Sequence, residues 1–297
     1  MIFGDADLLP GLTVDRYNDV LVTQVTSFAI EQRKDFIYQL LLNILNENNQ
    51  TVKYIYERND VQVRTKEGLE LYKGFYGKQT CSTDLVISEN HLLLNVDIQN
   101  GQKTGYFLDQ KSNRMLIRDM AKGLRVLDCF THTGGFALNA AKGEAKSVTA
   151  VDVSGTALEE ARKNAEINHF TNMTFVQADV FDYLEEMKEG EFDLIILDPP
   201  AFTKSRKTVK QAYYGYKRIN LEAMKKLENG GFLATCSCSR YMETSLFEQM
   251  LKEAALEANV LLKQVSVTQQ NHDHPILWSM KETSYLKFFI FQIVKEK

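Results

Sequence analysis

Four carboxylates and two thiols recur at one kind of position in the second half of the chain, at or near the end of a short apolar run. They are Asp128, Asp152, Asp179, Asp198, Cys236 and Cys238. A short apolar run is typical of a buried parallel strand, and the carboxyl ends of such strands form the ligand-binding edge of an open α/β sheet. A thiol at that edge can serve as a nucleophile. The sequence therefore predicts a site built along one sheet edge.

The stretch RVLDCFTHTGGF at residues 125–136 is an apolar run followed by Thr133-Gly134-Gly135 and the start of a helix-like pattern. Glycines let the backbone approach a ligand closely, and the helix that follows offers its N-terminus. A second apolar run ends at Asp152, and an acid about 20 residues after the glycines suits two ribose hydroxyls. The tract is not GxGxxG, so it favours a mononucleoside-type cofactor over a dinucleotide.

Two further acids have different surroundings. Asp179 follows the apolar run at residues 173–177. It could accept a hydrogen bond from the exocyclic amine of a purine, or it could cap the helix expected at residues 180–187. Asp198 opens an Asp-Pro-Pro sequence, whose prolines stop the strand and fix a rigid turn outside the sheet. This favours a carboxylate that faces the substrate.

The segment at residues 203–218 is basic, contains no acid and interleaves cations with tyrosines. A charge run is usually a solvated surface, but this one abuts the expected edge in a chain whose net charge is −4. Cations for phosphates and rings for unstacked bases are typical of RNA binding. The expected substrate-binding residues in and beside this segment are Phe202, Lys204, Arg206, Lys207, Tyr213, Tyr214 and Tyr216.

The tract GQKTGYFLDQKSNR at residues 101–114 precedes another helix-like pattern. It is either a turn that leads into a helix or a loop at the edge of the cofactor and the substrate. The second interpretation puts Gln110 among the cofactor-binding residues and Lys103 among the substrate-binding residues.

Length and composition limit the class of protein. The 297 residues allow one large domain or two ordinary ones, and we predict a small α/β domain at residues 1–85 that positions the substrate and a larger domain at residues 86–297. Four cysteines form no secreted framework, so reduced thiols and a cytoplasmic location are expected. No apolar run approaches the ~18 residues of a membrane span, and the N-terminus is no signal peptide. His272 and His274 lack a third ligand in the sequence, so no metal is expected.

The chain resembles the class I S-adenosylmethionine-dependent methyltransferases, and most closely the RlmI-type bacterial 23S ribosomal RNA cytosine-C5 methyltransferases. The matching stretches are GQKTGYFLDQKSNR, VLDCFTHTGGFALNAA, VTAVDVS, LDPPAFTKSR, TCSCS and DHP, in the family's order and spacing. The resemblance implies an α/β fold with a Rossmann-like methyltransferase sheet and a smaller N-terminal α/β domain. It also implies S-adenosylmethionine as cofactor and ribosomal RNA as partner, with no membrane and with a homodimer as one possible assembly.

The resemblance also implies roles for individual residues. The methionine part of the cofactor lies against residues 128–135, the ribose against Asp152 and the adenine edge against Asp179, while Asp198 faces the target base. The full cofactor-binding set is Gln110, Asp128, Phe130, Thr131, Thr133, Gly134, Gly135, Asp152, Val153, Ser154, Asp179, Val180 and Asp198.

Carbon 5 of cytosine is a poor nucleophile, and a thiolate that adds to carbon 6 makes it reactive. The resemblance aligns Cys236 with the Thr-Cys-Ser of related enzymes, so Cys236 is the predicted catalytic nucleophile, Cys238 the second choice and Asp198 the supporting acid. The alternative is methylation of an exocyclic amine or a ring nitrogen of guanine or adenine in ribosomal RNA. Asp-Pro-Pro followed by an aromatic residue is typical of amine methylation, but here Ala201 takes that place and Phe202 comes one residue later.

Family members usually carry an N-terminal PUA RNA-binding module. The sequence MIFGDADLLPG at the start of this chain resembles the tail of that module's junction. We therefore expect either that the module is absent or that the start is internal.

Overall fold

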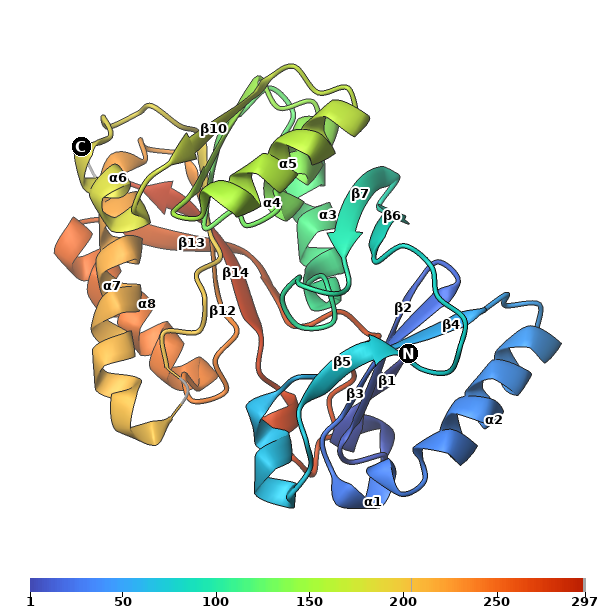
Figure 1. Cartoon of the computed structure of the whole chain (residues 1–297). Helices are drawn as coiled ribbons and strands as arrows, with labels where there is room; N and C mark the ends of the chain where they lie inside the picture. The colour runs from blue at the N-terminus through green and yellow to red at the C-terminus, as the bar shows by residue number, and fades with distance from the viewer. Residues whose placement is uncertain (204, 296–297) are drawn as a thin grey trace. The chain divides into compact units, whose positions relative to one another are not determined.

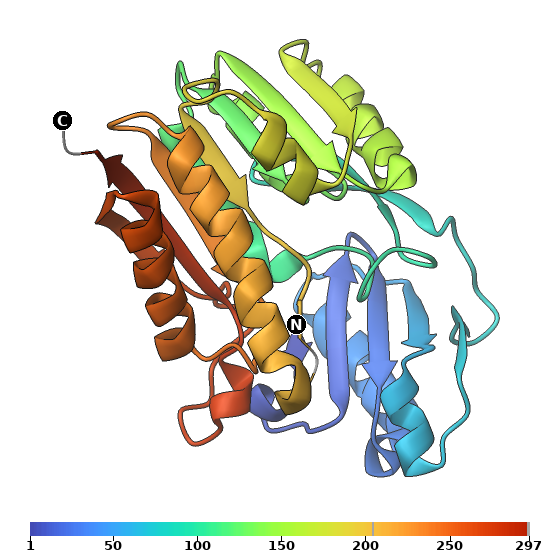
Figure 2. The same ribbon diagram turned by 90° about the vertical axis from the view of Figure 1, so that its left-hand side faces the viewer.

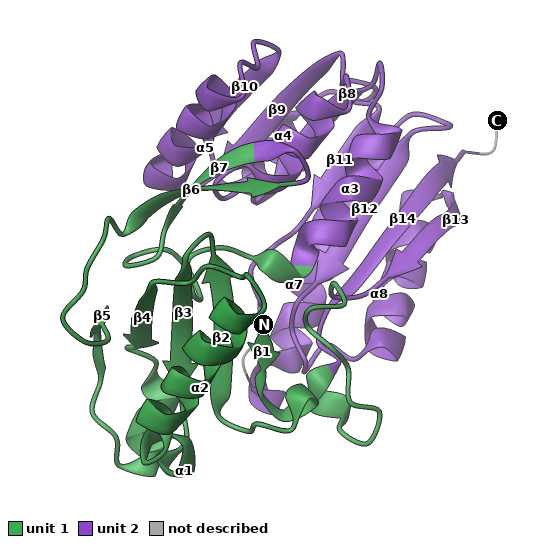
Figure 3. Cartoon of the chain, turned by 90° about the vertical axis from the view of Figure 1, so that its right-hand side faces the viewer, with its two compact units in different colours: residues 1–89, 93–109, 271–283 green, residues 90–92, 110–270, 284–297 purple. Residues whose placement is uncertain are grey.

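The computed structural model describes residues 1–203 and 205–295, and the chain folds into two compact units (Figure 3). Unit 1 comprises residues 1–89, 93–109 and 271–283. Unit 2 comprises residues 90–92, 110–270 and 284–297. Unit 1 thus comprises three stretches of chain, whereas the sequence predicted a domain formed by residues 1–85 alone.

Unit 1 is built on a five-stranded sheet with the order β1-β2-β3-β4-β5. Its strands are β1 (Ile2–Phe3), β2 (Leu12–Tyr17), β3 (Val20–Val25), β4 (Tyr54–Asn59) and β5 (Tyr72–Phe75). β3 and β4 are parallel, because the chain crosses over between them through the helices α1 (Phe28–Glu31) and α2 (Lys34–Glu47). The other neighbours pair antiparallel, so this unit differs in kind from a doubly wound sheet.

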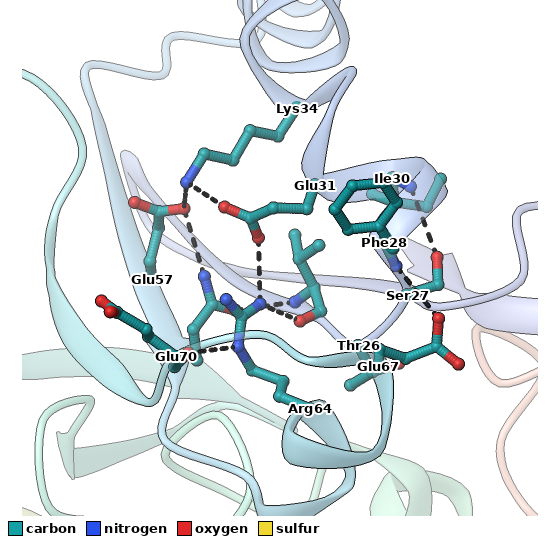
Figure 4. Close-up of polar contacts among 12 residues, drawn as sticks. Thr26, Ser27, Phe28, Ile30, Glu31, Lys34, Glu57, Arg64, Glu67 and Glu70 are labelled. Atoms are coloured by element: carbon teal, nitrogen blue, oxygen red, sulfur yellow. Dashed lines mark hydrogen bonds and ion pairs between the residues drawn. The ribbon is translucent and has the colours of Figure 1, made fainter.

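Charged side chains inside unit 1 pair with one another (Figure 4). Arg64, from the 3-10 helix η2 (Gln62–Glu67), is only 1% exposed, and its Nη1 donates to the carboxylate of Glu31 at 3.0 Å. Lys34 lies 2.8 Å from Glu31 and 3.2 Å from Glu57. Burying an isolated charge costs free energy, and these ion pairs offset that cost for the charged groups inside unit 1.

A two-stranded hairpin of β6 (Asp84–Glu89) and β7 (Leu92–Asp97) follows. Its turn residues, Asn90 and His91, have φ values of 52° and 59°, the left-handed conformation that two-residue hairpin turns require. Asn90 is also bonded to the helix α3 (Lys111–Met120), because Arg118 donates to its carbonyl at 2.8 Å. The tip of the hairpin, residues 90–92, is itself part of unit 2, and α3 holds it there.

Unit 2 is built on a seven-stranded sheet with the order β10-β9-β8-β11-β12-β14-β13, which can be followed in Figure 3. Figure 1 shows the same sheet from another side. Its strands are β8 (Arg125–Cys129), β9 (Ser147–Asp152), β10 (Met173–Gln177), β11 (Leu194–Leu197), β12 (Phe232–Ser237), β13 (Leu261–Thr268) and β14 (Lys287–Val294). Of these seven, β14 alone runs antiparallel to the rest. The order reverses between β8 and β11, the point at which open α/β sheets bind ligands outside the carboxyl ends of their strands.

Helices cover both faces of this sheet (Figure 2). They are α3, α4 (Gly135–Lys142), α5 (Gly155–Ile167), α6 (Val180–Glu186), α7 (Val209–Lys226) and α8 (Thr244–Ala258), with the 3-10 helix η4 (Arg206–Thr208) before α7. Leu194 and Ile196 of β11 pack in one core with α3 and α4, while Ile195 packs in the other with α6, α7 and α8. This alternation follows from the two-residue period of a strand. Among the described residues, no helix has the length and apolar character that a membrane crossing requires.

Candidate active site

The turn between β8 and α4 bends through three left-handed residues, Phe130 (φ 60°), His132 (φ 51°) and Gly134 (φ 87°). A Cβ on Gly134 would lie 3.2 Å from the Cβ of Ala161 in α5, so both the backbone angle and the space favour glycine there. α4 begins at the next residue, Gly135. The turn thus connects the end of β8 directly to the N-terminus of α4. The first backbone N–H groups of a helix have no hydrogen-bond partner within that helix, so they are available to a ligand.

Thr131 and Thr133 tie the same turn to its neighbours. The N–H of Thr131 donates to the carbonyl of Val151 in β9 at 3.1 Å. Asn164 of α5 donates from Nδ2 to the carbonyl of Thr133, also at 3.1 Å. The backbone of the turn is therefore held by both adjacent elements.

Asp128 is fully buried at the end of β8. Its Oδ2 accepts hydrogen bonds from the hydroxyl of Thr131 at 2.6 Å and from the N–H of Ala137 at 2.9 Å. Its Oδ1 has no hydrogen-bond partner among the described residues. Burial raises the pKa of Asp128 to about 7, the two hydrogen bonds oppose the rise, and the carboxylates of Asp198 and Asp152 add to it. A buried oxygen of this kind calls for a donor, which a ligand can provide.

Asp152 ends β9 and accepts two backbone hydrogen bonds, from the N–H of His132 at its Oδ2 and from the N–H of Ser154 at its Oδ1, each at 2.9 Å. The hydroxyl of Ser154 caps α5 by accepting from the N–H of Ala157 at 3.2 Å. Val153, between them, is 69% exposed. The carboxylate is thus fixed beside an open stretch of chain and next to the β8–α4 turn.

Asp179 is exposed at the end of β10 and caps α6, accepting from the N–H of Phe181 at 2.8 Å. The capping alternative that the sequence allowed is therefore observed. Val180 is buried as the first residue of α6. Asp179 also interacts electrostatically with Arg218 of α7, so its surroundings differ from those of Asp128.

Asp198, Cys236 and Gln110 come together from the end of β11, from β12 and from the residue before α3. The thiol of Cys236 donates to Oδ1 of Asp198 at 2.8 Å, and Nε2 of Gln110 donates to the same oxygen at 3.3 Å. Asn113 donates to Oε1 of Gln110 at 2.6 Å, which fixes how that amide points. Cys236 is fully buried, and burial, with Asp198 adding to the effect, raises the pKa of its thiol well above the ordinary value.

Cys238 has different surroundings, since it lies just beyond β12 and is half-buried. Lys287, the first residue of β14, is only 5% exposed, and its Nζ donates to the carbonyls of Ser239 at 2.7 Å and Tyr285 at 2.9 Å. Lys287 was not among the residues predicted from the sequence, because no motif marks it. A lysine inside an apolar strand pattern was the signal that could have found it.

Phe202 lies in an aromatic cluster rather than alone at the surface. Its ring centroid is 4.7 Å from that of Tyr216, 6.0 Å from that of Phe181 and 6.3 Å from that of Phe130. Tyr216 is fully buried, and its hydroxyl accepts from Ser237 at 3.0 Å. The ring of Tyr216 therefore belongs to the core of unit 2, and no face of it is open to a base.

The basic segment divides into an open part and a paired part. Arg206 and Lys207 are exposed, and Tyr214 is 59% exposed, whereas Tyr213 is half-buried. Lys204 lies outside the described residues.

Farther along α7, two cations of the segment have acidic partners. Lys217 lies 2.9 Å from Glu257, and Arg218 pairs with Glu185. Lys103 belongs to unit 1, where its Nζ lies 2.6 Å from the carboxylate of Asp109. Among the described residues, Arg206 and Lys207 near the beginning of the segment are exposed, whereas Lys217 and Arg218 at its end are paired.

Comparison with known proteins agrees with this architecture. Residues 74–290 match the protein family described as S-adenosylmethionine-dependent methyltransferase. A protein of Streptococcus mutans described as a SAM-dependent methyltransferase has a similar structure, with a TM-score of 0.81 and 24% identity over 98% of this chain and 73% of its own. The chain therefore belongs to the S-adenosylmethionine-dependent methyltransferases, and S-adenosylmethionine is its methyl donor.

Relatives with higher sequence identity define a narrower family within these methyltransferases. A protein of Aeromonas salmonicida is 45% identical over 95% of this chain and 71% of its own length. A protein of Aliivibrio fischeri is 41% identical over 99% of this chain and 74% of its own length. Both are named ribosomal RNA large subunit methyltransferase I, and the chain belongs to the family that they represent.

Proposed function

We propose that the protein transfers a methyl group from S-adenosylmethionine to carbon 5 of a cytosine in 23S ribosomal RNA. The observation that carries this proposal is the pair of thiols at the carboxyl end of β12, where Cys236 is bonded to Asp198 and Cys238 follows just beyond the strand. An amine or a ring nitrogen that is methylated already has a lone pair, so its methylation needs no thiol. The names of the relatives support ribosomal RNA of the large subunit as the substrate class.

The residues at the ends of β8 and β9 fit the cofactor. The unpaired buried Oδ1 of Asp128 suits the amino group of the methionine part, and Asp152 suits the ribose hydroxyls. Asp179 and Val180 suit the adenine edge. Further contacts are expected from Gln110, Phe130, Thr131, Thr133, Gly134, Gly135, Val153, Ser154 and Asp198. When bound, S-adenosylmethionine supplies an electrophilic methyl group on its sulfonium.

The chain's own groups make carbon 5 reactive. A cysteine thiolate adds to carbon 6, which forms a carbon–sulfur bond and moves the π electron pair of the ring to carbon 5. A proton held at Asp198 and shared with the ring nitrogen would stabilise this adduct. Once carbon 5 is methylated, its proton is removed, the electron pair of that C–H bond restores the double bond, and the thiolate leaves. The base must be unpaired or flipped out for this chemistry.

We assign the nucleophile to Cys238 rather than to Cys236, which the sequence analysis favoured. A catalytic thiol must be accessible and must ionise readily. Cys236 is fully buried and bonded to Asp198, and its pKa is raised. Cys238 is half-buried and interacts electrostatically with the ammonium group of Lys287, which is bonded to the next residue, Ser239. In this assignment Cys236 and Asp198 line the site that binds the target base.

Arg206, Lys207 and Tyr214 are the exposed residues best suited to hold the RNA. Roles in RNA binding for Lys103, Phe202, Lys204, Tyr213 and Tyr216 stay predictions from the sequence, and Tyr216 would have to leave the core to fulfil one. A substrate-positioning role for the N-terminal domain, a cytoplasmic location and a homodimer also stay predictions.

The test uses ribosomal RNA from cells that lack this protein, a labelled methyl donor, and the wild-type, Cys236→Ala and Cys238→Ala proteins. The product is digested and identified as a nucleoside. We expect 5-methylcytidine with the wild type, none with Cys238→Ala, and reduced but measurable product with Cys236→Ala.

Two other outcomes would change the proposal. Loss of product with Cys236→Ala but not with Cys238→Ala would assign the nucleophile to Cys236. A methylated guanine or adenine, formed by both variants as well as by the wild type, would replace the proposal with amine or ring-nitrogen methylation.

A further inference from the structure

Lys287 is a buried cation that has no part in the proposed methyl transfer. It opens β14, the strand that pairs antiparallel with β12, and its register partner is Ser237, between the two cysteines. Its side chain is almost completely buried. A lysine is rarely enclosed in this way unless its ammonium group is satisfied and serves a purpose there.

The hydrogen bonds of Lys287 fix its ammonium group at the turn that carries Cys238. Nζ donates to the carbonyl of Ser239, the residue directly after Cys238, at 2.7 Å. It also donates to the carbonyl of Tyr285 at 2.9 Å. Carbonyls stabilise the ammonium without neutralising it, so the positive charge stays available to the groups around it. The lysine thus holds the backbone next to Cys238 and places a full charge beside that residue.

The charges around Lys287 are consistent with this geometry. Burial lowers the pKa of Lys287 to about 8, while Cys238, Cys236 and Glu243 raise it, so the amine is still mostly protonated at pH 7. The hydroxyl of Tyr216 also interacts electrostatically with the two thiols, but its raised pKa keeps it neutral. Asp198 accepts a hydrogen bond from the thiol of Cys236. Among these groups Lys287 is the cation, and the others are acids or neutral hydrogen-bond partners.

We propose that Lys287 is a positioning residue that holds the turn after β12 and supplies the positive charge that favours the thiolate of Cys238. The thiol proton passes to water, and the resulting thiolate is retained by the adjacent ammonium group. The consequence for turnover rests on the proposed function, but the effect on the thiol itself does not. Lys287 touches neither the base nor the cofactor in this proposal.

The experiment measures the rate of alkylation of Cys238 by iodoacetamide as a function of pH, without RNA or cofactor. Mass spectrometry of the peptide that carries Cys238 separates this thiol from the others, and Cys81 in unit 1 is the internal reference. The variants are Lys287→Gln, Lys287→Met and Lys287→Arg, with the exposed Lys252→Met of α8 as a matched control. Gln can still donate to the two carbonyls but carries no charge, so it separates the charge from the hydrogen bonds.

We expect Lys287→Gln to move the midpoint of the pH profile of Cys238 upward by about one unit, which slows alkylation at pH 7 about tenfold. Lys287→Arg restores much of the wild-type rate, and Lys252→Met leaves the profile unchanged. A folded Lys287→Gln protein with the wild-type profile would overturn the proposal. If Lys287→Met unfolds, the comparison of Gln with Arg still decides the outcome.

Methylation assays on the same proteins separate this proposal from the proposed function. A shifted alkylation profile with no 5-methylcytidine from the wild type would leave the role of Lys287 intact and remove the cytosine chemistry. An unshifted profile with a wild-type enzyme that forms 5-methylcytidine would remove the role of Lys287 and leave the cytosine chemistry intact.

Discussion

At the scale of single residues, Asp128 couples cofactor binding to pH. Burial raises its pKa to about 7, so the free protein holds this carboxyl partly protonated at neutral pH. A ligand ammonium group at Oδ1 requires the ionised form, and binding must then release the proton. We therefore expect the affinity for S-adenosylmethionine to rise about tenfold between pH 6 and pH 8 and to level off above the pKa.

Isothermal titration calorimetry in two buffers of different ionisation enthalpy measures both the affinity and the released proton. Asp128→Asn should bind more weakly and show no such pH dependence. Asp193→Asn is the matched control, because Asp193 pairs with Arg125 at the start of β8 and its pKa is lowered rather than raised. An affinity of the wild type that is flat from pH 6 to pH 8 would exclude Asp128 as the partner of the ammonium group.

The sequence indicated the residue types of the site better than their surroundings. The positions of the acids after the apolar runs could be predicted from the sequence. Asp152 and Asp198 both interact electrostatically with Asp128. The difference between Cys236 and Cys238 could not be read, because it depends on where β12 ends. Lys287 lies near these thiols because β14 pairs with β12, a strand distant from it in the sequence. A local sequence pattern carries no information on which strands pair.

At the scale of elements, local pattern predicted the pieces but not their arrangement. The run at residues 173–177 is β10 with the same bounds, and the helix expected at residues 180–187 is α6 (Val180–Glu186). Apolar runs alone do not predict the insertion of antiparallel β14 between β12 and β13, because an apolar run shows burial but neither direction nor neighbours. That insertion is what brings Lys287 to the thiols.

The basic segment before and within α7 yields a prediction about RNA binding, given the proposed function. Arg206 and Lys207 are exposed and form no ion pair with the other described residues, so they can contact phosphates. Replacing both with Gln should weaken RNA binding and lower the slope of log affinity against log salt by about 0.7 for each phosphate that is no longer neutralised, the value for single strands. Fluorescence anisotropy with a labelled RNA fragment at several salt concentrations measures both quantities.

The matched control removes the same charge from the same segment. Lys217 and Arg218 already pair with Glu257 and Glu185, so the double substitution with Gln should change the salt slope little. Equal weakening of RNA binding in the two double variants would mean that net charge alone, rather than the open beginning of the segment, governs the affinity.

At the scale of the whole molecule, the division into two units raises the question of whether they unfold separately. The chain passes between unit 1 and unit 2 at several points, and β7 (Leu92–Asp97) begins in one unit and continues in the other. Asn90, at the tip of this hairpin, is bonded to Lys111 and Arg118 of α3. Loss of order in unit 2 would therefore free the hairpin and the segment at residues 271–283 that completes unit 1. This connectivity favours unfolding as one cooperative system.

Saturation with S-adenosylmethionine tests this cooperativity, because the proposed cofactor contacts all lie in unit 2. A ligand at about 100 times its Kd stabilises the folded state by about 2.7 kcal/mol, which slows exchange through global unfolding about 100-fold. Hydrogen exchange followed by mass spectrometry should show that slowing in β8 and β9 and equally in the slowest amides of β2 and β3. Slowing confined to β8 and β9 would instead mean that unit 1 opens on its own. A unit that opens independently can rearrange without disturbing the bound cofactor, whereas cooperative units couple the two events. The exchange pattern therefore also decides whether cofactor binding stabilises unit 1.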